Sequence, residues 1–477
     1  MPSILPVLIV LAVLSPAVRP QRRLSKFTEV YAWRQITYDI DGVLLTQDRD
    51  EPVGLSNRNR RQADDEEVIW DWNVEDPNVQ SPTGPTPRST APSTSRPTAS
   101  NNSDENRFFI QYNNVPMGME RVGNRLFVTI PRRRYGIPST LNYIDLDTAR
   151  DRSPALKPYP DIRQAQSVTS VYRTRADSCG RLWMVDTGRL ELAGTQRQLQ
   201  TPSILIYDLN TDRLIHRYFL KQTDLPAEDT PTGLASITVD ITNGNCADAY
   251  AYIPDLTTFG IVVYSLREND SWRHTHNYFS YNPLHGALNI ADQSFSWRDG
   301  IFSITLLPGT GDCKTAYFHP LIGVEEFQVS TCVLKNRTAI NDRNYFSLYY
   351  VVGNRGEGTQ STMHDYHPGT RVIFFAEIGR DAVSCWNSGE LLRSTNVAIL
   401  ARERRALSYP SDLHVTGDEV WVMANTLPRF GYSRLNPNDY NFYIYKANVM
   451  DAISGTVCAT SFSNRGGFNA TDNDLLH

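Results

Sequence analysis

Short stretches of apolar residues, bounded by polar and turn residues, recur along most of this chain. RLFVTIP (125–131), RLWMVDTG (181–188) and DAYAYIPD (248–255) each run from a polar start through aliphatic and aromatic residues to Pro, Asp or Gly. The same layout returns in DGIFSITLLP (299–308), SLYYVVGN (347–354) and DEVWVMANTLP (418–428). Such runs predict β-strands. No long segment with the 3.6-residue helical period competes with them, so we predict an all-β protein.

These strands also indicate an internal repeat. Each has an aromatic residue at its centre, and the six are Phe127, Trp183, Tyr250, Phe302, Tyr349 and Trp421. The spacing leaves roughly 60 residues per repeat, enough for a four-stranded sheet with its loops. We therefore predict a six-bladed β-propeller, closed by pairing of an N-terminal with a C-terminal strand; the alternative is a β-sandwich array.

Three repeats share a longer layout, in which a strand of about five residues, a turn and the aromatic strand form a hairpin. They are SVYRTRADSCGRLWMVD (170–186), SITVDITNGNCADAYAYIPD (236–255) and SDLHVTGDEVWVMAN (411–425). In a propeller the first strand of each hairpin lines the central channel. We therefore expect the starts of these strands to converge at one mouth of the channel, bringing together Thr169, Ser170, Ala235, Ser236, Ser411 and Asp412.

The composition divides the rest of the chain. Residues 1–18 hold one apolar run, which predicts a secretory signal peptide and a secreted, extracellular protein without a membrane span. Residues 27–41 alternate as the N-terminal strand of the propeller. Residues 42–107 form an insertion, rich in Pro, Ser and Thr, that we predict to be disordered. The propeller follows at 108–462, and a flexible tail at 463–477.

The insertion contains the basic run RNRRQ at 58–62. Its arginines match the dibasic pattern that secretory convertases cut, which predicts a cleavage site after Arg61. A solvated basic run in a loop is an equally good interpretation.

The six cysteines suit an oxidising compartment, and none has the CxxC spacing of a zinc site. Cys179 and Cys246 precede equivalent strands of neighbouring repeats, so we pair them. Cys313 and Cys332 flank a hairpin whose turn lies near 321–324, and Cys385 and Cys458 remain to tie the last repeat together. Six cysteines allow fifteen pairings, so this set is a hypothesis. Four N-glycosylation sequons, typical of a secreted glycoprotein, lie at Asn101, Asn269, Asn336 and Asn469.

The charge pattern of the chain argues against one class of partner, nucleic acids. The net charge is −5 with acids and bases intermixed, so we expect no nucleic-acid partner. The basic run RRR at 132–134 suits an acidic matrix protein or a solvated surface loop. The HDYH segment at 364–367 holds two histidines, but Pro368 and Gly369 suggest a loop, so we predict no metal site and no cofactor.

Several motifs, in one order, resemble the insect yellow/major royal jelly protein family. They include PRRRYGIPSTLNYID (131–145), DSCGRLWMVDTG (177–188) and SDLHVTGDEVWVMANTLP (411–428), and the similarity runs from about residue 108 to 462. The resemblance implies a secreted six-bladed propeller and the first and third disulfides above, whereas the middle one is particular to this chain. It also implies functions in melanin, cuticle and eggshell pigmentation, some with dopachrome conversion, and in binding of biogenic amines.

A channel site for a small aromatic amine or catechol needs an aromatic face and hydrogen-bond acceptors. The predicted ligand-binding residues are Ser411, Asp412, Asn425, Phe430, Ser170 and Ser236, although Asp412 and Asn425 also suit a role in capping turns. The weak catalytic candidate is His414, which alternation places on the face of Asp412. We therefore expect a binding protein of cuticle or eggshell; the alternative is a dopachrome-converting enzyme of the tautomerase or decarboxylase type.

Overall fold

The computed structural model describes residues 22–53, 104–192, 195–227 and 230–459. The predicted signal peptide, the run RNRRQ with Arg61, the tail 463–477 and the sequons at Asn101 and Asn469 lie outside the described residues. Asn269 and Asn336 are described, and both are exposed. In the part of the chain that is described, no helix is both long and apolar enough to cross a bilayer.

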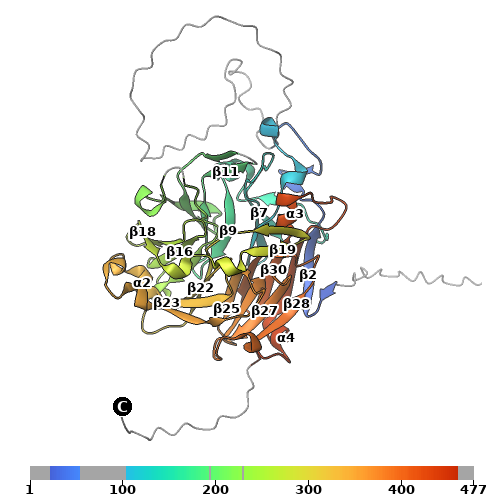
Figure 1. Cartoon of the computed structure of the whole chain (residues 1–477). Helices are drawn as coiled ribbons and strands as arrows, with labels where there is room; N and C mark the ends of the chain where they lie inside the picture. Colours follow the sequence, from blue (N-terminus) through green and yellow to red (C-terminus); the bar gives the residue numbers. More distant parts are fainter. Residues whose placement is uncertain (1–21, 54–103, 193–194, 228–229, 460–477) are drawn as a thin grey trace, which may run out of the picture.

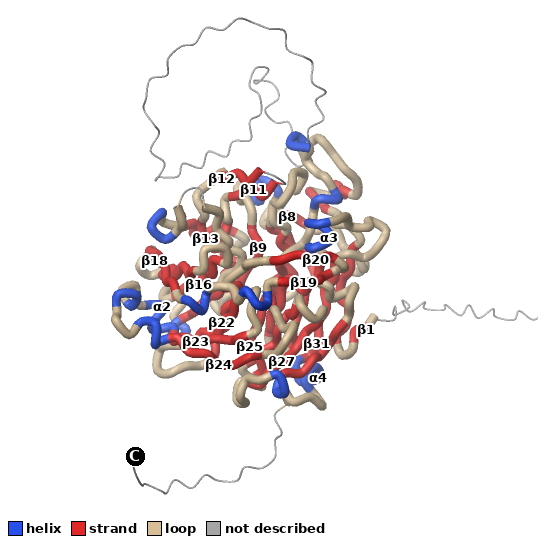
Figure 2. Tube along the Cα trace, viewed as in Figure 1, coloured by secondary structure: helices blue, strands red, loops and turns tan. Residues whose placement is uncertain are grey.

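Six antiparallel sheets form a β-propeller, as the repeats predict (Figures 1 and 2). The first blade comprises β5 (Gly118–Val122), β6 (Arg125–Thr129), β7 (Leu141–Asp145) and β8 (Lys157–Pro158). The second comprises β9 (Val171–Ala176), β10 (Arg181–Asp186), β13 (Ser203–Asp208) and β14 (Arg213–Phe219). The third comprises β15 (Thr238–Ile241), β16 (Ala249–Asp255), β17 (Gly260–Ser265) and β18 (Asp270–Thr275).

The fourth blade comprises β21 (Ile301–Leu307), β22 (Thr315–Pro320), β23 (Glu325–Ser330) and β24 (Tyr349–Asn354). The fifth comprises β25 (Ser361–His367), β26 (Val372–Glu377), β27 (Ala382–Asn387) and β28 (Val397–Arg402). The sixth comprises β29 (Tyr409–Thr416), β30 (Glu419–Asn425), β31 (Phe442–Asn448) and two N-terminal strands, β2 (Phe27–Trp33) and β1 (Arg23–Leu24). The innermost strands β5, β9, β15, β21, β25 and β29 contact one another in a closed ring.

Smaller elements decorate the blades. Three two-stranded hairpins are β3 (Tyr38–Ile40) with β4 (Val43–Leu45), β11 (Arg189–Leu192) with β12 (Thr195–Gln198), and β19 (Ala287–Ile290) with β20 (Gln293–Ser296). The short α-helices are α1 (Ile162–Gln166), α2 (Thr331–Lys335), α3 (Leu427–Tyr432) and α4 (Val449–Ile453). The 3₁₀ turns are η1 (Asp104–Asn106), η2 (Gln111–Asn113), η3 (Gln222–Asp224), η4 (Thr242–Gly244), η5 (Asn277–Phe279), η6 (Pro283–His285), η7 (Ala339–Asn341), η8 (Tyr345–Leu348) and η9 (Ser394–Asn396).

The ring closes through the N-terminal strand. β2 pairs antiparallel with β31, so a segment that precedes the insertion completes the last blade (Figure 1, blue beside red). Phe27, Tyr31 and Trp33 on β2 are buried, and the Trp33 indole donates a hydrogen bond to the Pro154 carbonyl at 2.8 Å. Closure in this way covers the outer edge of β31, which would otherwise be free to pair with another chain.

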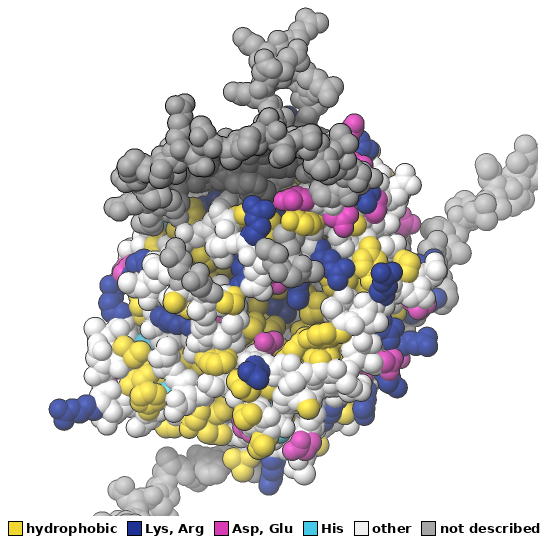
Figure 3. All heavy atoms as spheres, turned by 45° about the horizontal axis from the view of Figure 1, so that its top comes forward, with side chains coloured by type: hydrophobic (Ala, Val, Ile, Leu, Met, Phe, Trp, Pro, Cys, Tyr) yellow, Lys and Arg dark blue, Asp and Glu magenta, His cyan; other side chains and the backbone are white. Residues whose placement is uncertain are grey.

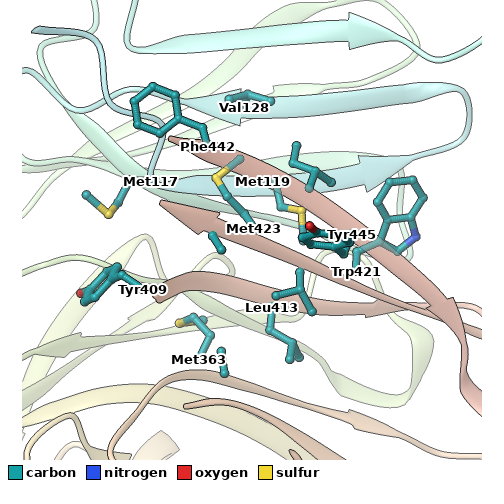
Figure 4. Packing of buried hydrophobic residues seen from close by; sticks show 14 of the residues in the cluster. Met117, Met119, Val128, Met363, Tyr409, Leu413, Trp421, Met423, Phe442 and Tyr445 are labelled. Carbon is teal, nitrogen blue, oxygen red and sulfur yellow. The ribbon is translucent and has the colours of Figure 1, made fainter. Parts of the chain in front are cut away.

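The middle strands of the blades are buried on both faces because each sheet is packed between two others. This explains why β17, β26 and β27 are apolar almost throughout, without the alternation of a one-faced sheet. Between the first and last blades, Met117, Met119 and Met423 belong to the same buried cluster as Trp421 and Phe442 (Figure 4). Flexible methionine side chains fill the irregular space between twisted sheets.

The structure corrects the alignment of two repeats. Phe302 lies on the innermost strand β21, and Tyr349 lies at the start of the outermost strand β24, so neither matches Trp183 on the second strand β10. Both residues belong to the fourth blade, whose second strand is β22, and the fifth blade, whose second strand is β26, contains none of the six aromatic residues. All of these strands share one apolar pattern, so pattern alone does not fix the position of a strand in its blade.

Part of the insertion that the sequence predicts to be disordered has a defined structure in the described residues. Residues 43–53 include β4, and Arg49 forms a β-bridge with Phe109. Leu45 and Val53 are buried in the main core. This part of 42–107 therefore packs against the propeller because it carries apolar side chains that the Pro/Ser/Thr-rich stretch lacks.

All three inferred disulfides are present. Cys179–Cys246 joins the second and third blades, and Cys313–Cys332 lies within the fourth. Cys385–Cys458 ties the segment after α4 to β27 of the fifth blade. The described chain contains no free cysteine.

Candidate functional site

A cavity of about 510 Å³ opens at one mouth of the channel. The face drawn in Figure 3 is hollowed near its centre, with basic, acidic and apolar side chains in the hollow. The lining comes from five of the six blades and from the loops between their strands: Met117, Arg133, Arg134, Tyr172, Arg173, Thr187, Arg189, Glu191, Gln196, Thr232, Gly233, Leu234, Ala235, Leu256, Thr257, Trp297, Asp299, Phe302, Tyr409, Leu427, Phe430, Gly431 and Tyr432.

The cavity combines cations with aromatic rings. Four arginines line it against two carboxylates, those of Glu191 and Asp299. The guanidinium of Arg134 lies 3.9 Å from the centre of the Phe430 ring, and that of Arg173 lies 4.8 Å from the centre of Phe302. These two aromatic faces therefore already hold cations of the protein itself, which leaves the cavity better suited to an anionic than to a cationic ligand.

Arg173 on β9 lines the cavity and joins three blades. Its Nε and Nη2 atoms donate to the Ser411 carbonyl at 3.2 and 2.5 Å, and its Nη1 atom donates to the Ala235 carbonyl at 2.9 Å. An ion pair with the Asp412 carboxylate at 3.6 Å balances its charge. The side chain is buried, so the starts of β9, β15 and β29 are joined through one guanidinium.

Asp299 is a cavity carboxyl with a raised pKa. It lies between β20 and β21, beside the innermost strand of the fourth blade. Burial raises the pKa of its carboxyl to about 6, although the positive charge of Arg133 works in the opposite direction. A carboxyl whose pKa is close to neutrality can accept a proton and return it at physiological pH.

Two tyrosines complete the polar lining. Burial, together with the nearby Glu191 carboxylate, raises the pKa of Tyr172 well above its usual value. Burial likewise raises the pKa of Tyr409, against the effect of Arg173. Both phenols therefore stay protonated at neutral pH and can act as hydrogen-bond donors.

Of the six predicted ligand-binding residues, only Phe430 lines this cavity. The Ser170 hydroxyl accepts a hydrogen bond from the Arg132 backbone at 2.9 Å, and the Ser236 hydroxyl donates to the Phe302 carbonyl at 2.7 Å. The Ser411 hydroxyl is buried and has no hydrogen-bond partner among the described residues. The three strand starts do approach one another through Arg173, but their hydroxyl groups do not line the cavity.

Asp412 and Asn425 have structural contacts. The Asp412 carboxylate accepts a hydrogen bond from the Met119 backbone at 2.8 Å, which links the sixth blade to the first. The Asn425 side chain donates to the Pro116 carbonyl at 2.8 Å and accepts from the Leu427 backbone at 2.9 Å. Asn425 thus holds the start of α3, as the turn-capping alternative predicts.

His414 belongs to a second cavity, of about 570 Å³, and is absent from the lining of the first. Its Nδ1 atom lies 2.5 Å from Nη1 of Arg175, and its Nε2 atom lies 3.3 Å from the Asp412 carboxylate. Burial disfavours the charged ring, but the carboxylates of Asp412 and Glu120 outweigh it and raise the pKa of His414. Its neighbours make it part of a buried charge network rather than of the first cavity.

Sequence reasoning missed the arginines and Asp299. In the run RRR, Arg132 is buried and donates to backbone carbonyls, including those of Val168 and Thr169, whereas Arg133 and Arg134 line the cavity. The position of RRR directly after β6, at the mouth of the channel, was the available signal. The sequence pattern does not single out Asp299, because it aligns the segment 299–308 with the second strands of other blades, whereas β21 is the innermost strand of its blade.

The molecule is therefore a closed six-bladed propeller with an arginine-rich, aromatic cavity at one mouth of its channel. The family model described as "Major royal jelly protein" matches residues 169–458. The chain belongs to this family.

Two named relatives are similar to the chain over most of its length. The chain is 44% identical over 361 residues to "L-dopachrome tautomerase yellow-f" of Drosophila melanogaster, covering 73% of this chain and 83% of the relative. It is 38% identical over 362 residues to "Protein yellow" of Drosophila yakuba, covering 73% of this chain and 65% of that protein.

Proposed function

We propose that the 510 Å³ cavity binds a small aromatic carboxylate of the catechol or indoline-quinone class and isomerises it, with L-dopachrome as the reference substrate. The observation that carries the proposal is the presence of Asp299, with a pKa of about 6, in a cavity lined by four arginines. The arginines suit the carboxylate of such a ligand, and the aromatic side chains suit its ring.

The proposed reaction is a proton transfer without an external oxidant. The Asp299 carboxylate removes a proton from a ring carbon, and the electron pair of that C–H bond moves through the conjugated ring to a quinone oxygen. The oxygen then takes up a proton, so the product is an isomer of the substrate. Tyr172 and Tyr409, both protonated, donate hydrogen bonds to the oxygen on which negative charge develops.

Absorbance of dopachrome tests the enzyme directly. The full chain with intact disulfides is expected to accelerate dopachrome loss and to give a product that keeps the carboxylate. Asp299→Asn should lower the rate by roughly 10²–10⁴-fold, the usual range for a general base. Asp312→Asn, an exposed acid outside the cavity lining, is the matched control and should leave the rate unchanged. An Asp299→Asn variant with the unaltered rate would contradict the proposal.

The second candidate function is binding of an aromatic amine or catechol without turnover. The carboxylates of Glu191 and Asp299, together with Trp297 in the lining, favour it. Calorimetry with dopamine, serotonin and dopachrome separates the two functions. Saturable binding of the amines, with dopachrome decay equal to a blank, would favour the binding protein.

We further propose that this protein is secreted and acts in the pigmentation or assembly of cuticle or eggshell. Its partners there would include extracellular matrix proteins. Three disulfides and membership of the family support an oxidising, extracellular location. Immunodetection of the chain in medium from insect cells, together with transcript localisation across tissues, tests this part of the proposal.

A further inference from the structure

A second cluster of chemically active side chains lies between the fourth and fifth blades, away from the first cavity. His319 is on β22, Glu326 on β23 and His364 on β25. All three side chains are completely buried, and one ligand atom from each lies within 4.8 Å of the others.

The hydrogen bonds of His319 determine where its lone pair points. Its Nε2 atom lies 3.1 Å from the Ser361 carbonyl, which can only accept, so Nε2 carries the proton. In the neutral ring Nδ1 is then an unprotonated acceptor, and it faces Oε2 of Glu326 at 3.1 Å. Two acceptors at this distance repel each other unless a cation or a proton lies between them.

His364 is oriented in a similar way. Its Nδ1 atom lies 2.7 Å from the Ser303 hydroxyl, which fixes the ring. Its Nε2 atom lies 3.0 Å from Oε1 of Glu326, yet neither atom has a hydrogen bond of acceptable geometry among the described residues. In each imidazole, one nitrogen contacts an oxygen of a neighbouring serine residue and the other nitrogen points at the Glu326 carboxylate.

The carboxylate itself is also supported. Arg355 donates to Oε2 of Glu326 at 2.6 Å, and Oε1 has no hydrogen-bond partner in the described part of the chain. Metal-binding histidines and carboxylates have outer hydrogen-bond partners of this kind, which fix their orientation. Here each of the three side chains has one: Ser361 for His319, Ser303 for His364 and Arg355 for Glu326.

We propose that His319, Glu326 and His364 bind a divalent transition metal of the zinc type. Two imidazoles and one carboxylate are a ligand set that zinc and other first-row metals use. Oε1 of Glu326 would be the oxygen ligand, since Oε2 is engaged by Arg355. His364 also lines the 570 Å³ cavity at the other end of the channel, so the three side chains lie beside a cavity. The bound metal would join the fourth blade to the fifth.

The structure also shows why the sequence predicts no such site. HDYH lies on strand β25, not in the expected loop. His367 contacts Thr370 at 2.9 Å and Asp418 at 3.2 Å, away from His364. The partners of His364 lie about 40 residues upstream in sequence, on a neighbouring blade.

The test uses the full chain, purified without metal-affinity resin, stripped with a chelator and titrated with Zn²⁺ by calorimetry. We expect one equivalent to bind and the melting temperature to rise with it. His319→Gln and His364→Gln should each weaken binding by at least about tenfold, while His367→Gln, on the same strand as His364, should not.

A measurement on the unaltered chain covers variants that fail to fold. X-ray absorption at the zinc edge of the loaded protein should show two imidazoles and an oxygen ligand at about 2.0–2.2 Å. Failure to bind Zn²⁺, a spectrum without imidazole scattering, or nuclear magnetic resonance evidence that His319 is a metal-free imidazolium would each overturn the proposal.

Discussion

Replacement of Arg173 by methionine tests the central connection between blades. Methionine has a similar length and no charge, so it fills much of the space but removes the hydrogen bonds to the Ser411 and Ala235 carbonyls. It also leaves the completely buried Asp412 carboxylate without its arginine partner. The free energy of unfolding should therefore fall.

The expected loss follows from the burial of the pair. Removal of one partner from a buried ion pair costs about 3–5 kcal/mol, since the other charge stays desolvated. We add no separate cost for the Ala235 and Ser411 carbonyls that lose their hydrogen-bond donor, because free-energy contributions within one network are not additive. For a domain of this size we expect the melting temperature to fall by about 2 °C for each kcal/mol, or roughly 8 °C in total.

Calorimetric melting of the disulfide-intact chain measures the effect, and a double-mutant cycle with Asp412→Asn tests its cause. Since the amide that Asp412→Asn introduces needs no counter-charge, the double variant should recover at least about 1 kcal/mol relative to the sum of the single variants. The control is Arg267→Met on an exposed arginine, expected to lie within about 0.5 kcal/mol of the parent. A loss below about 1 kcal/mol for Arg173→Met, or strict additivity with Asp412→Asn, would refute the role assigned to Arg173.

Three further predictions concern the cavity and the ring. Because the pKa of Asp299 is about 6 and only the ionised form accepts a proton, dopachrome conversion should rise roughly tenfold between pH 5 and pH 7, after subtraction of the uncatalysed rate; a rate independent of pH over this range would exclude Asp299 as the base. Arg134→Ala removes a cation from the cavity and frees the face of the Phe430 ring. It should therefore weaken binding of dopachrome by about tenfold or more and strengthen binding of dopamine. Calorimetry with both ligands measures the two affinities, and an equal change in both would contradict the charge argument. Conversion of both Cys385 and Cys458 to serine should lower the free energy of unfolding by about 4 kcal/mol, because the disulfide restricts the unfolded chain over a separation of 73 residues. Urea unfolding measures this free energy, and no loss would contradict the entropic explanation.

The blade number and the ring closure could be predicted from the sequence because they depend on repeated local patterns. Most strands of the blades run for five to eight residues with turn residues between them, and the N-terminal alternation at 27–40 is a clear strand signal. The position of a strand within its blade could not be predicted in the same way. β21 and β10 both read as buried apolar runs, although one is innermost and the other second in its sheet.

The site was harder to predict than the fold because its residues lie far apart in the sequence and come together only in the folded propeller. The Arg173 side chain, further along β9 than the strand start at 170, connects the strand starts of β15 and β29 through the Ala235 and Ser411 carbonyls. The direction of a side chain at a strand start depends on local bulges, such as the one between Pro410 and Asp412. Alternation alone could not reveal that Ser411 turns away from the cavity while Tyr409 lines it.

The pairing of β2 with β31 has a practical consequence for anyone who shortens the protein. A recombinant version that begins after the insertion, at residue 104, would keep every strand of the first five blades, yet the sixth would end on an unpaired β31. Hydrophobic surface now covered by Phe27, Tyr31 and Trp33 would face water, next to backbone groups ready to pair with another chain. Such a truncation should aggregate, and adding a synthetic peptide of residues 22–41 should reduce the aggregation.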